Sequence, residues 1–383
     1  MLRTPDSVDK KNISTSEKDF KCMKKILVAM SGGVDSSVVA ALLVKQGYDV
    51  TGAYMKQWSD TKDVSGLCQW KKDRRDAMRV AAHLDIPLIT LDFEKEYKEW
   101  VMGYMFAEYE AGRTPNPDVM CNKYIKFDAW LHKIIEMGFE QMATGHYAIV
   151  SEYCADAESV THYSLLIPKD KEKDQTYFLH QLSQEQLAHT IFPLGEYTKK
   201  EVRDMAQKFD LPTANRAESM GICFVGKVPM KDFLQQKIKK NPGNIVNEQG
   251  EVVGVHDGLA FYTIGQRHIG QQTTDNRQQT DHQKPQYVLD KRFNTNELVV
   301  GGEESKLLYK KDIAVEDMHW ISGHKAEFPL KCMVRIRHRQ PLQPATYLED
   351  NKIIFEDPQR AATPGQFAVV YKDDICLGGG IIK

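Results

Sequence analysis

Apolar and polar positions between residues 25 and 144 alternate in a way that predicts strands, each followed by an amphipathic helix. The run KILVAM at 25–30 predicts a strand, and residues 36–46 carry apolar side chains at helical spacing up to Gly47. Further strands are predicted at 50–55, 87–91 and 141–144, and further helices at 73–84, at about 95–111 and around 130–135. This alternation is typical of a doubly wound parallel sheet with helices on both faces, which binds ligands at the carboxyl ends of its strands.

The pattern changes after about residue 225, where glycines and turn residues multiply. A polar, low-complexity stretch follows at 270–284. From residue 331 onward, short strands alternate with turns, at 331–338, 345–349, 352–355, 366–371 and 375–382, which predicts a small β-barrel or sandwich. We therefore predict a flexible tail at 1–22, an α/β domain at 23–225, a small central domain at 226–300 and a C-terminal β-barrel domain at 301–383.

With 383 residues, 42% of them apolar, the chain is long enough for two or three domains, each with its own hydrophobic core. It contains no run of about 20 apolar residues, the length that spans a bilayer. The first residues lack the apolar centre of a signal peptide, and their acidic side chains argue against an organelle-targeting peptide. We therefore expect a cytoplasmic protein without membrane contact, with the mitochondrial matrix as the less favoured alternative. Lysine and arginine (51) nearly balance aspartate and glutamate (53), so any nucleic acid would be bound by local basic patches.

Seven cysteines are scattered along the chain, at positions 22, 68, 121, 154, 223, 332 and 376. They form no CxxC pair and no cluster with histidine, and the sequence has no HExxH helix. We therefore predict neither a zinc site nor a disulfide scaffold. For any one cysteine taken alone, the simplest interpretation is a small buried apolar side chain.

The segment Ser31–Ser37 (SGGVDSS) lies between a predicted strand and a predicted helix. Two adjacent glycines let the backbone approach an anion closely, and serine hydroxyls together with the first N–H groups of the helix can hold a phosphate. The segment has no Gly-Lys-Ser/Thr, which excludes the common nucleotide-binding loop. A glycine-rich turn without a ligand is the alternative, but the segment resembles the PP-loop (SGGxDS) of enzymes that cleave ATP to AMP and pyrophosphate.

Two later segments place cysteines in unusual surroundings. In GRTPNPDVMCNK, two prolines one residue apart predict an extended backbone that fixes Asn116, Asp118 and Cys121 relative to one another. An aspartate three residues before a cysteine can exchange protons with a nearby substrate or thiol. In ESMGICFVG, Cys223 lies between glycines, which predicts a segment that can move.

These segments and others along the chain resemble those of the tRNA-specific 2-thiouridylases, in order from about Lys24 to the C-terminus. The segments that carry the resemblance are AMSGGVDSS, YMKQW, AGRTPNPD with VMCNKYIKF, ATGHYA, KDQTYFL, FPLG, GICFVG, YTIGQRHIG, TPGQFAVVY and CLGGG. PNPD followed by CNK, and later GICF, are specific to this family. The resemblance implies a tRNA-uridine 2-sulfurtransferase that acts on uridine 34, the wobble position, in tRNAs for Lys, Glu and Gln.

The resemblance also implies which residues bind ATP. They are Ala29, Met30, Ser31, Gly32, Gly33, Val34, Asp35, Ser36 and Ser37 in the loop, together with Met55 and Gly145. Mg²⁺ would accompany ATP, and no metal site on the protein is implied. ATP would adenylate uracil O2 and release pyrophosphate into the loop, because that oxygen is otherwise a poor leaving group.

Catalytic and tRNA-contacting residues are implied in the same way. Asp118 would be the acid/base, Cys121 the nucleophile, and Cys223 the residue that carries sulfur as a persulfide. The sulfur would come from a cysteine desulfurase or a sulfur-relay protein, and a disulfide between the two cysteines would release it to the base. The tRNA contacts would be made by Asn116, Pro117, Asp118, His146, Lys173, Asp174, Gln175, Arg337, His338 and Gln366.

Basic residues near the C-terminus extend the tRNA-binding hypothesis. Arg335, Arg337 and Arg339 alternate along the predicted strand at 331–338, so they would share one face and could follow a phosphate backbone. An ordinary solvated strand face is the alternative. Residues 60–75 depart from the pattern of the common bacterial members, so Cys68 gets no role.

Two other functions remain open. The first is another AMP-forming PP-loop enzyme that modifies a different base, which would leave PNPD without its family role. The second is a non-catalytic tRNA-binding protein that has kept the fold. The presence of Asp35, Cys121 and Cys223 argues against the second.

Overall fold

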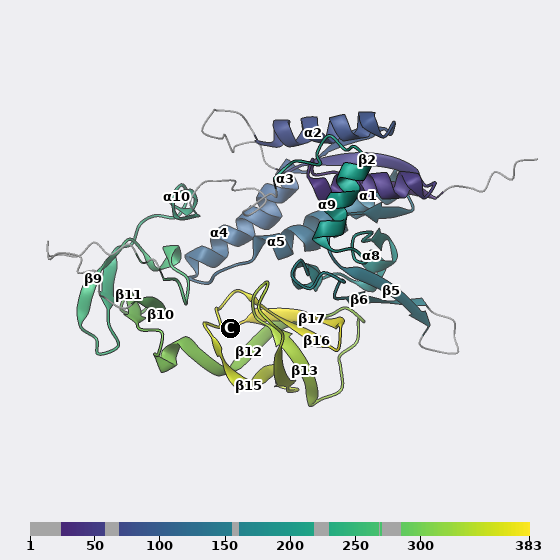
Figure 1. The fold of residues 1–383 in the computed structure, drawn as a ribbon. Coiled ribbons are helices and arrows are strands. Elements are labelled where there is room, and N and C mark those ends of the chain that lie inside the picture. The colour runs from purple at the N-terminus through teal and green to yellow at the C-terminus, as the bar shows by residue number, and fades with distance from the viewer. Residues whose placement is uncertain (1–23, 58–68, 155–160, 218–229, 268, 270–284) are drawn as a thin grey trace, which may run out of the picture.

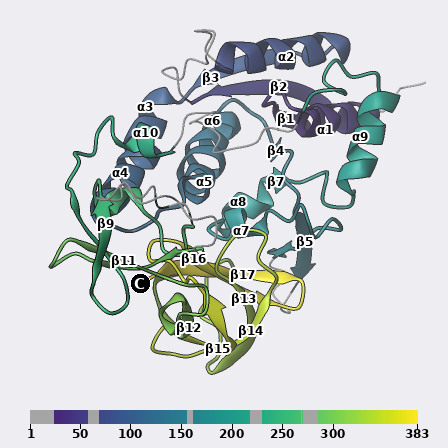
Figure 2. The same ribbon diagram turned by 60° about the vertical axis from the view of Figure 1, so that its left-hand side comes forward.

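The structure is a computed structural model that describes residues 24–57, 69–154, 161–217, 230–267, 269 and 285–383. Figure 1 shows an α/β domain formed by the first half of the chain and, below it, a β-barrel formed by the C-terminal part. A smaller sheet lies to one side of both, beneath α10 (Figures 1 and 2). Among the described residues, no helix is long and apolar enough to cross a membrane.

The α/β domain is built on a five-stranded parallel sheet, which confirms the predicted fold class. In order across the sheet, its strands are β3 (Leu88–Asp92), β2 (Asp49–Lys56), β1 (Lys25–Ala29), β4 (Gln141–Ala143) and β7 (Thr190–Ile191). Because side chains alternate along a strand, Ile26 and Val28 of β1 pack on one face of the sheet and Leu27 packs on the other. Both faces are buried, which explains why β1 is apolar almost without interruption.

Helices cover both faces of this sheet. On the face of Ile26 lie α1 (Val34–Lys45), α2 (Gln69–His83) and α9 (Lys199–Lys208). On the face of Leu27 lie two longer helical segments, each with a π-helical stretch. They are α3 (Glu94–Glu96), η1 (Tyr97–Met102) and α4 (Gly103–Glu110), and then α5 (Pro117–Met120), η2 (Cys121–Trp130) and α6 (Leu131–Glu136). The helices predicted at 73–84, 95–111 and 130–135 are confirmed.

The backbone around Asn116 differs from the extended loop predicted there. Asn116 itself is extended, and its Oδ1 accepts a hydrogen bond from the N–H of Val119 at 3.3 Å, which caps α5. Pro117 occupies the first helical position, and Asp118 and Cys121 follow on the helix. The prediction was wrong from Pro117 onward, because a proline φ angle of about −65° suits the first turn of a helix as well as an extended chain.

A four-stranded sheet forms the central part of the chain. In order, its strands are β10 (Tyr287–Arg292), β11 (Glu297–Gly301), β8 (Gly243–Val246) and β9 (Val252–His256). The short helix α10 (Met230–Leu234) and the 3₁₀ turn η3 (Leu259–Phe261) pack against the main core. The low-complexity stretch predicted at 270–284 lies outside the described residues.

The C-terminal strands close into a barrel, as predicted. Its strands are β12 (Tyr309–Trp320), β15 (Lys352–Arg360), β14 (Gln343–Tyr347), β13 (Leu330–Arg335), β16 (Phe367–Lys372) and β17 (Ile375–Ile382), and β12 pairs with β17 to close the ring. A hairpin from the first half of the chain, β5 (Ile149–Cys154) and β6 (Thr161–Leu166), extends the same sheet beyond β17. The short helices α7 (Thr176–Leu179) and α8 (Gln184–Ala188) connect β6 to β7 of the parallel sheet. The 3₁₀ turn η4 (Lys306–Leu308) connects β11 of the central sheet to β12 of the barrel.

Strand β13 is shorter than the strand predicted at 331–338. It ends at Arg335, and Arg339, in the turn that follows, has a φ of 65°, in the left-handed region. Arg335, Arg337 and Arg339 therefore do not share a strand face, because the chain turns directly after β13 and the period of two no longer applies. The prediction of a three-arginine face was wrong.

Arg335 instead joins the barrel to the α/β domain. Its Nη1 lies 2.7 Å from Asp174 Oδ2, and the two side chains are 8% and 2% exposed. Asp174 Oδ1 accepts hydrogen bonds from the N–H of Thr176 at 2.9 Å and from its hydroxyl at 2.7 Å. The guanidinium also lies over the ring of Tyr371, 5.5 Å from its centroid. Each charge is compensated, and removal of either would leave the other buried without a counter-ion.

We predict that Arg335→Met destabilises the protein by about 3 kcal/mol, because the variant leaves the Asp174 carboxylate buried and unpaired. Thermal unfolding followed by calorimetry measures the effect. Arg292→Met is the matched control, since the Arg292 side chain is 45% exposed and its pair with Glu297 lies near the surface. Equal unfolding temperatures for the two variants would contradict the role given to Arg335.

Candidate functional site

The connection between β1 and α1 forms a cradle at the carboxyl edge of the parallel sheet. The N-cap of α1 is Gly33, which has no side chain to accept hydrogen bonds from the first N–H groups of the helix. These N–H groups can therefore donate to a ligand such as a phosphate. Gly32 has a φ of 76°, and a Cβ atom there would lie 2.2 Å from the carbonyl oxygen of Asp73. Only glycine fits this position, and it lets the loop lie close against α2.

Serine hydroxyls hold this loop together. Ser37 Oγ donates to the Gly33 carbonyl at 2.7 Å, and Ser36 Oγ donates to the same carbonyl at 3.3 Å. Ser31 Oγ accepts a hydrogen bond from the N–H of Gly33 at 3.3 Å. The residues from Ala29 to Ser37, predicted to bind ATP, therefore form one compact loop in which hydroxyls and N–H groups lie together, as a phosphate-binding loop requires.

Asp35 is held by a lysine and a tyrosine that the sequence analysis did not single out. Lys199 Nζ, from the start of α9, lies 2.6 and 2.8 Å from the two carboxylate oxygens. Tyr147 donates its hydroxyl to one of these oxygens at 3.1 Å. The lysine neutralises a carboxylate that would otherwise repel a phosphate in the loop. It lies 164 residues from Asp35, so no local pattern indicated the pair.

Gln175 holds Tyr147 in place. Its side-chain oxygen accepts a hydrogen bond from the N–H of Tyr147 at 2.9 Å, and its own N–H donates to the Tyr147 carbonyl at 3.0 Å. The preceding residue, Asp174, is the partner of Arg335, and Lys173 before it is half-buried. Asp174 and Gln175, both predicted to contact tRNA, thus make protein contacts that connect the barrel to Tyr147.

Arg216, another residue that the sequence analysis missed, joins the loop to α2. Its Nη1 donates to the Gly32 carbonyl at 2.7 Å and to Asp76 Oδ2 at 2.7 Å, and its second terminal nitrogen bonds to Asp73. Both aspartates belong to α2. The guanidinium therefore fixes the conformation of the loop without any ligand.

Gly145 lies against the start of α1. A Cβ atom at this position would be 3.1 Å from Asp35 Cβ and 3.1 Å from the backbone nitrogen of Ser36. Such a distance is shorter than side chains normally tolerate, which explains a glycine here. The two segments predicted to bind ATP on this side of the sheet therefore meet in space.

Gln57 connects Met55 to Cys121. Its side-chain nitrogen lies 3.9 Å from the Met55 sulfur and 3.6 Å from Cys121 Sγ. Met55 is near the carboxyl end of β2, and Cys121, which is 3% exposed, begins η2. The structure therefore brings the predicted nucleophile to the same edge of the sheet as the β1–α1 loop. Gln57 stands in the motif YMKQW but was not predicted as a site residue.

The segment that leads to Cys121 is attached to the barrel by Gln366. Gln366 Nε2 donates to the carbonyls of Thr114 at 2.9 Å and Pro115 at 3.0 Å. Its Oε1 accepts a hydrogen bond from Asn116 Nδ2 at 3.4 Å, and Asp118 is half-buried on the helix that follows. Two residues predicted to contact tRNA, Asn116 and Gln366, thus meet across the boundary between the barrel and the α/β domain.

His146 is half-buried among aromatic rings. Its Nδ1 lies 2.7 Å from Thr144 Oγ1, and the centroids of the Phe127 and Phe192 rings are 5.8 and 5.9 Å from its own. Burial, and then the charge of Lys126, hold the pKa of His146 well below its usual value. The ring is therefore neutral at pH 7, so it can exchange hydrogen bonds but carries no charge.

Arg337 and His338 follow β13. The His338 ring lies 4.4 Å from that of Phe178, and Arg337 Nη2 donates to the Arg360 carbonyl at 3.2 Å. Burial, and then two neighbouring arginines, lower the pKa of His338 to about 4. Of this pair, predicted to contact tRNA, only Arg337 is therefore a cation at pH 7.

Cys121, Cys332 and Cys376 are free, buried cysteines. Burial raises the pKa of Cys332 to about 11 and raises that of Cys376 as well, so both thiols stay protonated and inert in the barrel. Cys223, the predicted sulfur carrier, lies outside the described residues, and no disulfide is formed by the three cysteines named here.

Three family profiles match the chain in succession. They are a tRNA methyl transferase HUP domain at 24–227, a tRNA methyl transferase PRC-barrel domain at 231–302 and an aminomethyltransferase β-barrel domain at 310–382. Among solved structures, the U34-tRNA thiolase NcsA from Methanococcus maripaludis is similar with a TM-score of 0.35 and 15% identity, over 56% of this chain and 64% of that chain. That likeness is too distant to guide residue assignments.

Two bacterial proteins match the chain almost from end to end, and their names differ from those of the profiles. The tRNA-specific 2-thiouridylase MnmA of Halalkalibacterium halodurans is 44% identical over 366 residues, which cover 94% of both chains. The tRNA-specific 2-thiouridylase MnmA of Streptococcus agalactiae is 46% identical over 366 residues, which cover 94% of this chain and 95% of the relative. The profile names refer to methyl transfer, but each describes a single domain, whereas these relatives align over 94% of the chain. The chain therefore belongs to the tRNA-specific 2-thiouridylase family.

Proposed function

We propose that this protein uses ATP to replace oxygen by sulfur at C2 of uridine 34, the wobble position of tRNA. The observation that carries the proposal is the position of Cys121, which contacts Gln57 at the sheet edge that also presents the Ser31–Ser37 loop. A nucleotide in the loop and a thiol at this edge can act on one base. Membership of the family supports the same activity, that of a tRNA-uridine 2-sulfurtransferase.

The residues of the loop fit the phosphates of ATP. The first turn of α1 supplies N–H donors, and Gly32 and Gly145 leave space that a Cβ atom would fill. Transfer of the adenylyl group to uracil O2 breaks the bond between the α- and β-phosphates and releases pyrophosphate. Mg²⁺ would arrive with ATP, bound to its phosphate oxygens.

Sulfur would follow as a persulfide on Cys223. Its outer sulfur attacks C2 of the adenylated base, and AMP leaves with the former O2. The Cys121 thiolate then attacks the Cys223 sulfur, which leaves the outer sulfur on C2 as a thiocarbonyl and joins the two cysteines in a disulfide. Asp118, three residues before Cys121, would accept the thiol proton. A thiol reductant restores both cysteines.

The tRNA would bridge the α/β domain and the barrel. Asn116 and Gln366 meet across that boundary, and Arg337 supplies a cation beside it. Asp174 is buried there and would position its neighbours Lys173 and Gln175. From the resemblance, we infer tRNAs for Lys, Glu and Gln as substrates and a cysteine desulfurase or sulfur-relay protein as donor. From the amino-acid sequence, we infer the cytoplasm as the place of action.

The first test concerns the cleavage of ATP. Asp35→Ala removes the carboxylate that Lys199 and Tyr147 hold, so we expect tRNA-dependent release of AMP and pyrophosphate to fall about 100-fold, as when one polar group of a preorganised site is lost. Chromatography of products from labelled ATP measures the loss. Asp204→Ala, at an exposed position of α9, is the control and should keep the native rate. ADP and phosphate as native products would exclude the proposed activation.

The second test separates the roles of the two cysteines. With labelled sulfur from a cysteine desulfurase, Cys121→Ser should accept the label in a form that a reductant removes, yet make no 2-thiouridine. Cys223→Ser should neither accept the label nor make product, because it lacks the carrier thiol. Mass spectrometry of nucleosides and of the labelled protein measures both outcomes.

During turnover without reductant, a disulfide between Cys121 and Cys223 should accumulate, which requires their Cα atoms to come within roughly 7 Å. Cys332→Ala is the control for substitution of a thiol, since Cys332 is buried in the barrel and should affect neither loading nor product. Stoichiometric label on Cys121 in the Cys223→Ser variant would reverse the assignment. Full activity of either serine variant would exclude a mechanism with two cysteines.

A further inference from the structure

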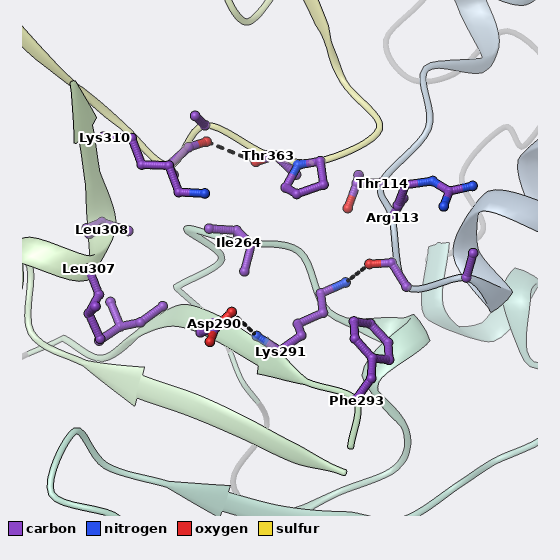
Figure 3. A pocket seen from close by; sticks show the side chains of 16 residues that line it. Arg113, Thr114, Ile264, Asp290, Lys291, Phe293, Leu307, Leu308, Lys310 and Thr363 are labelled. Atoms are coloured by element: carbon purple, nitrogen blue, oxygen red, sulfur yellow. Dashed lines mark hydrogen bonds between the residues drawn. The ribbon is translucent and has the colours of Figure 1, made fainter. Parts of the chain in front are cut away.

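A cavity of about 340 Å³ lies where three parts of the chain meet (Figure 3). It is lined by residues 112–114, which begin the segment leading to Cys121, by β10 of the central sheet and by the start of β12 in the barrel. Apolar side chains such as those of Ile264 and Leu289 form much of its wall. None of the residues assigned above to ATP, to catalysis or to tRNA lines it, so the cavity is separate from the proposed active site.

One cation is buried in the wall of this cavity. Lys291 is 9% exposed, and its Nζ donates to the Gly112 carbonyl at 2.9 Å. Figure 3 shows its side chain reaching from β10 toward that carbonyl. Asp290, beside it, accepts a hydrogen bond from the backbone N–H of Lys291 at 2.8 Å, and among the described residues no carboxylate acts on the ammonium as a counter-ion. Burial lowers the pKa of Lys291 to about 8. A buried ammonium without a counter-ion is unfavourable, and a bound anion would stabilise it.

The surroundings of Lys291 favour an anion that carries an aromatic group. Lys310 on β12 and Arg113 also line the cavity, so within the described part of the chain three cationic side chains line it and only one carboxylate, that of Asp290. Arg113 is already paired with Glu108. Phe293 lines it as well and is 54% exposed. An exposed ring beside cations is the arrangement that stacks a nucleic-acid base and holds its phosphate.

We propose that this cavity binds one nucleotide of the tRNA other than the target uridine, with its base on Phe293 and its phosphate at Lys291 and Lys310. The proposal rests on the proposed function, because it takes tRNA as the ligand. An ammonium has three donors, and only one of those of Lys291 is used by Gly112, so the lysine can bind a phosphate and keep that contact. The nucleotide would thus bind next to the segment that carries Asp118 and Cys121.

The affinity for tRNA, measured without ATP at several salt concentrations, tests this site. Lys291→Met and Lys310→Met should each weaken binding about tenfold and lower the salt slope by about one, because each removes one phosphate contact. Lys291→Arg keeps the charge and should keep the native slope. Lys311→Met is the matched control, since Lys311 is exposed, follows Lys310 on β12 and does not line the cavity. Lys310 is exposed too, so its variant tests the site even where Lys291→Met does not fold.

Stacking is tested by Phe293→Trp, whose added emission should be quenched on titration with tRNA and not by AMP. Equal quenching by AMP would overturn the assignment to RNA. If the native protein binds tRNA tightly and both lysine-to-methionine variants match it in affinity and salt slope, the site is refuted while the proposed function stands. If the native protein does not bind tRNA, the proposed function itself fails.

Discussion

The ion pair between Arg335 and Asp174 lies at the boundary between the barrel and the α/β domain, where both side chains are almost fully buried. Two buried charges of opposite sign fix the elements that carry them more strictly than apolar contacts do, because any separation leaves each charge without its partner. Hairpin β5–β6, which belongs to the first half of the chain, adds backbone hydrogen bonds to β17 at the same boundary. The barrel is therefore part of the framework of the site.

The effect of this ion pair reaches the ATP loop through covalent neighbours and hydrogen bonds. Asp174 precedes Gln175, whose side chain and N–H both bond to Tyr147, and Tyr147 donates to Asp35 in the first turn of α1. Lys199 adds the charge that keeps Asp35 in this position. The orientation of one carboxylate at the loop thus depends on residues of α1, α9 and the turn before α7, and that turn is held by the barrel.

The sequence predicted features that depend on local pattern. The parallel sheet, its helices and the Ser31–Ser37 loop could be recognised because they depend on local features of the sequence. These features are the spacing of apolar side chains and the placement of glycines within a few residues of one another. The Asp35–Lys199 pair and the Gln57–Cys121 contact could not, since 164 and 64 residues separate their members and only the fold brings them together. Arg335 was predicted on an exposed face, for contact with a phosphate backbone or with solvent, because charged side chains are usually exposed. Its buried partner, Asp174, lies 161 residues away and is brought to it only by the tertiary structure.

The segment between Gly112 and Cys121 shows why a protein of this kind needs three parts. Lys291 of the central sheet bonds to the carbonyl of Gly112, and Gln366 of the barrel bonds to Thr114, Pro115 and Asn116. Asn116 then caps the helix that carries Asp118 and leads into Cys121. The α/β domain alone would leave this segment with unsatisfied carbonyls on both sides of its prolines, and a thiol on a loosely held segment spends less time in the geometry that sulfur transfer requires. The central sheet and the barrel thus bind RNA, as we propose, and at the same time hold the thiol where the adenylated base would lie.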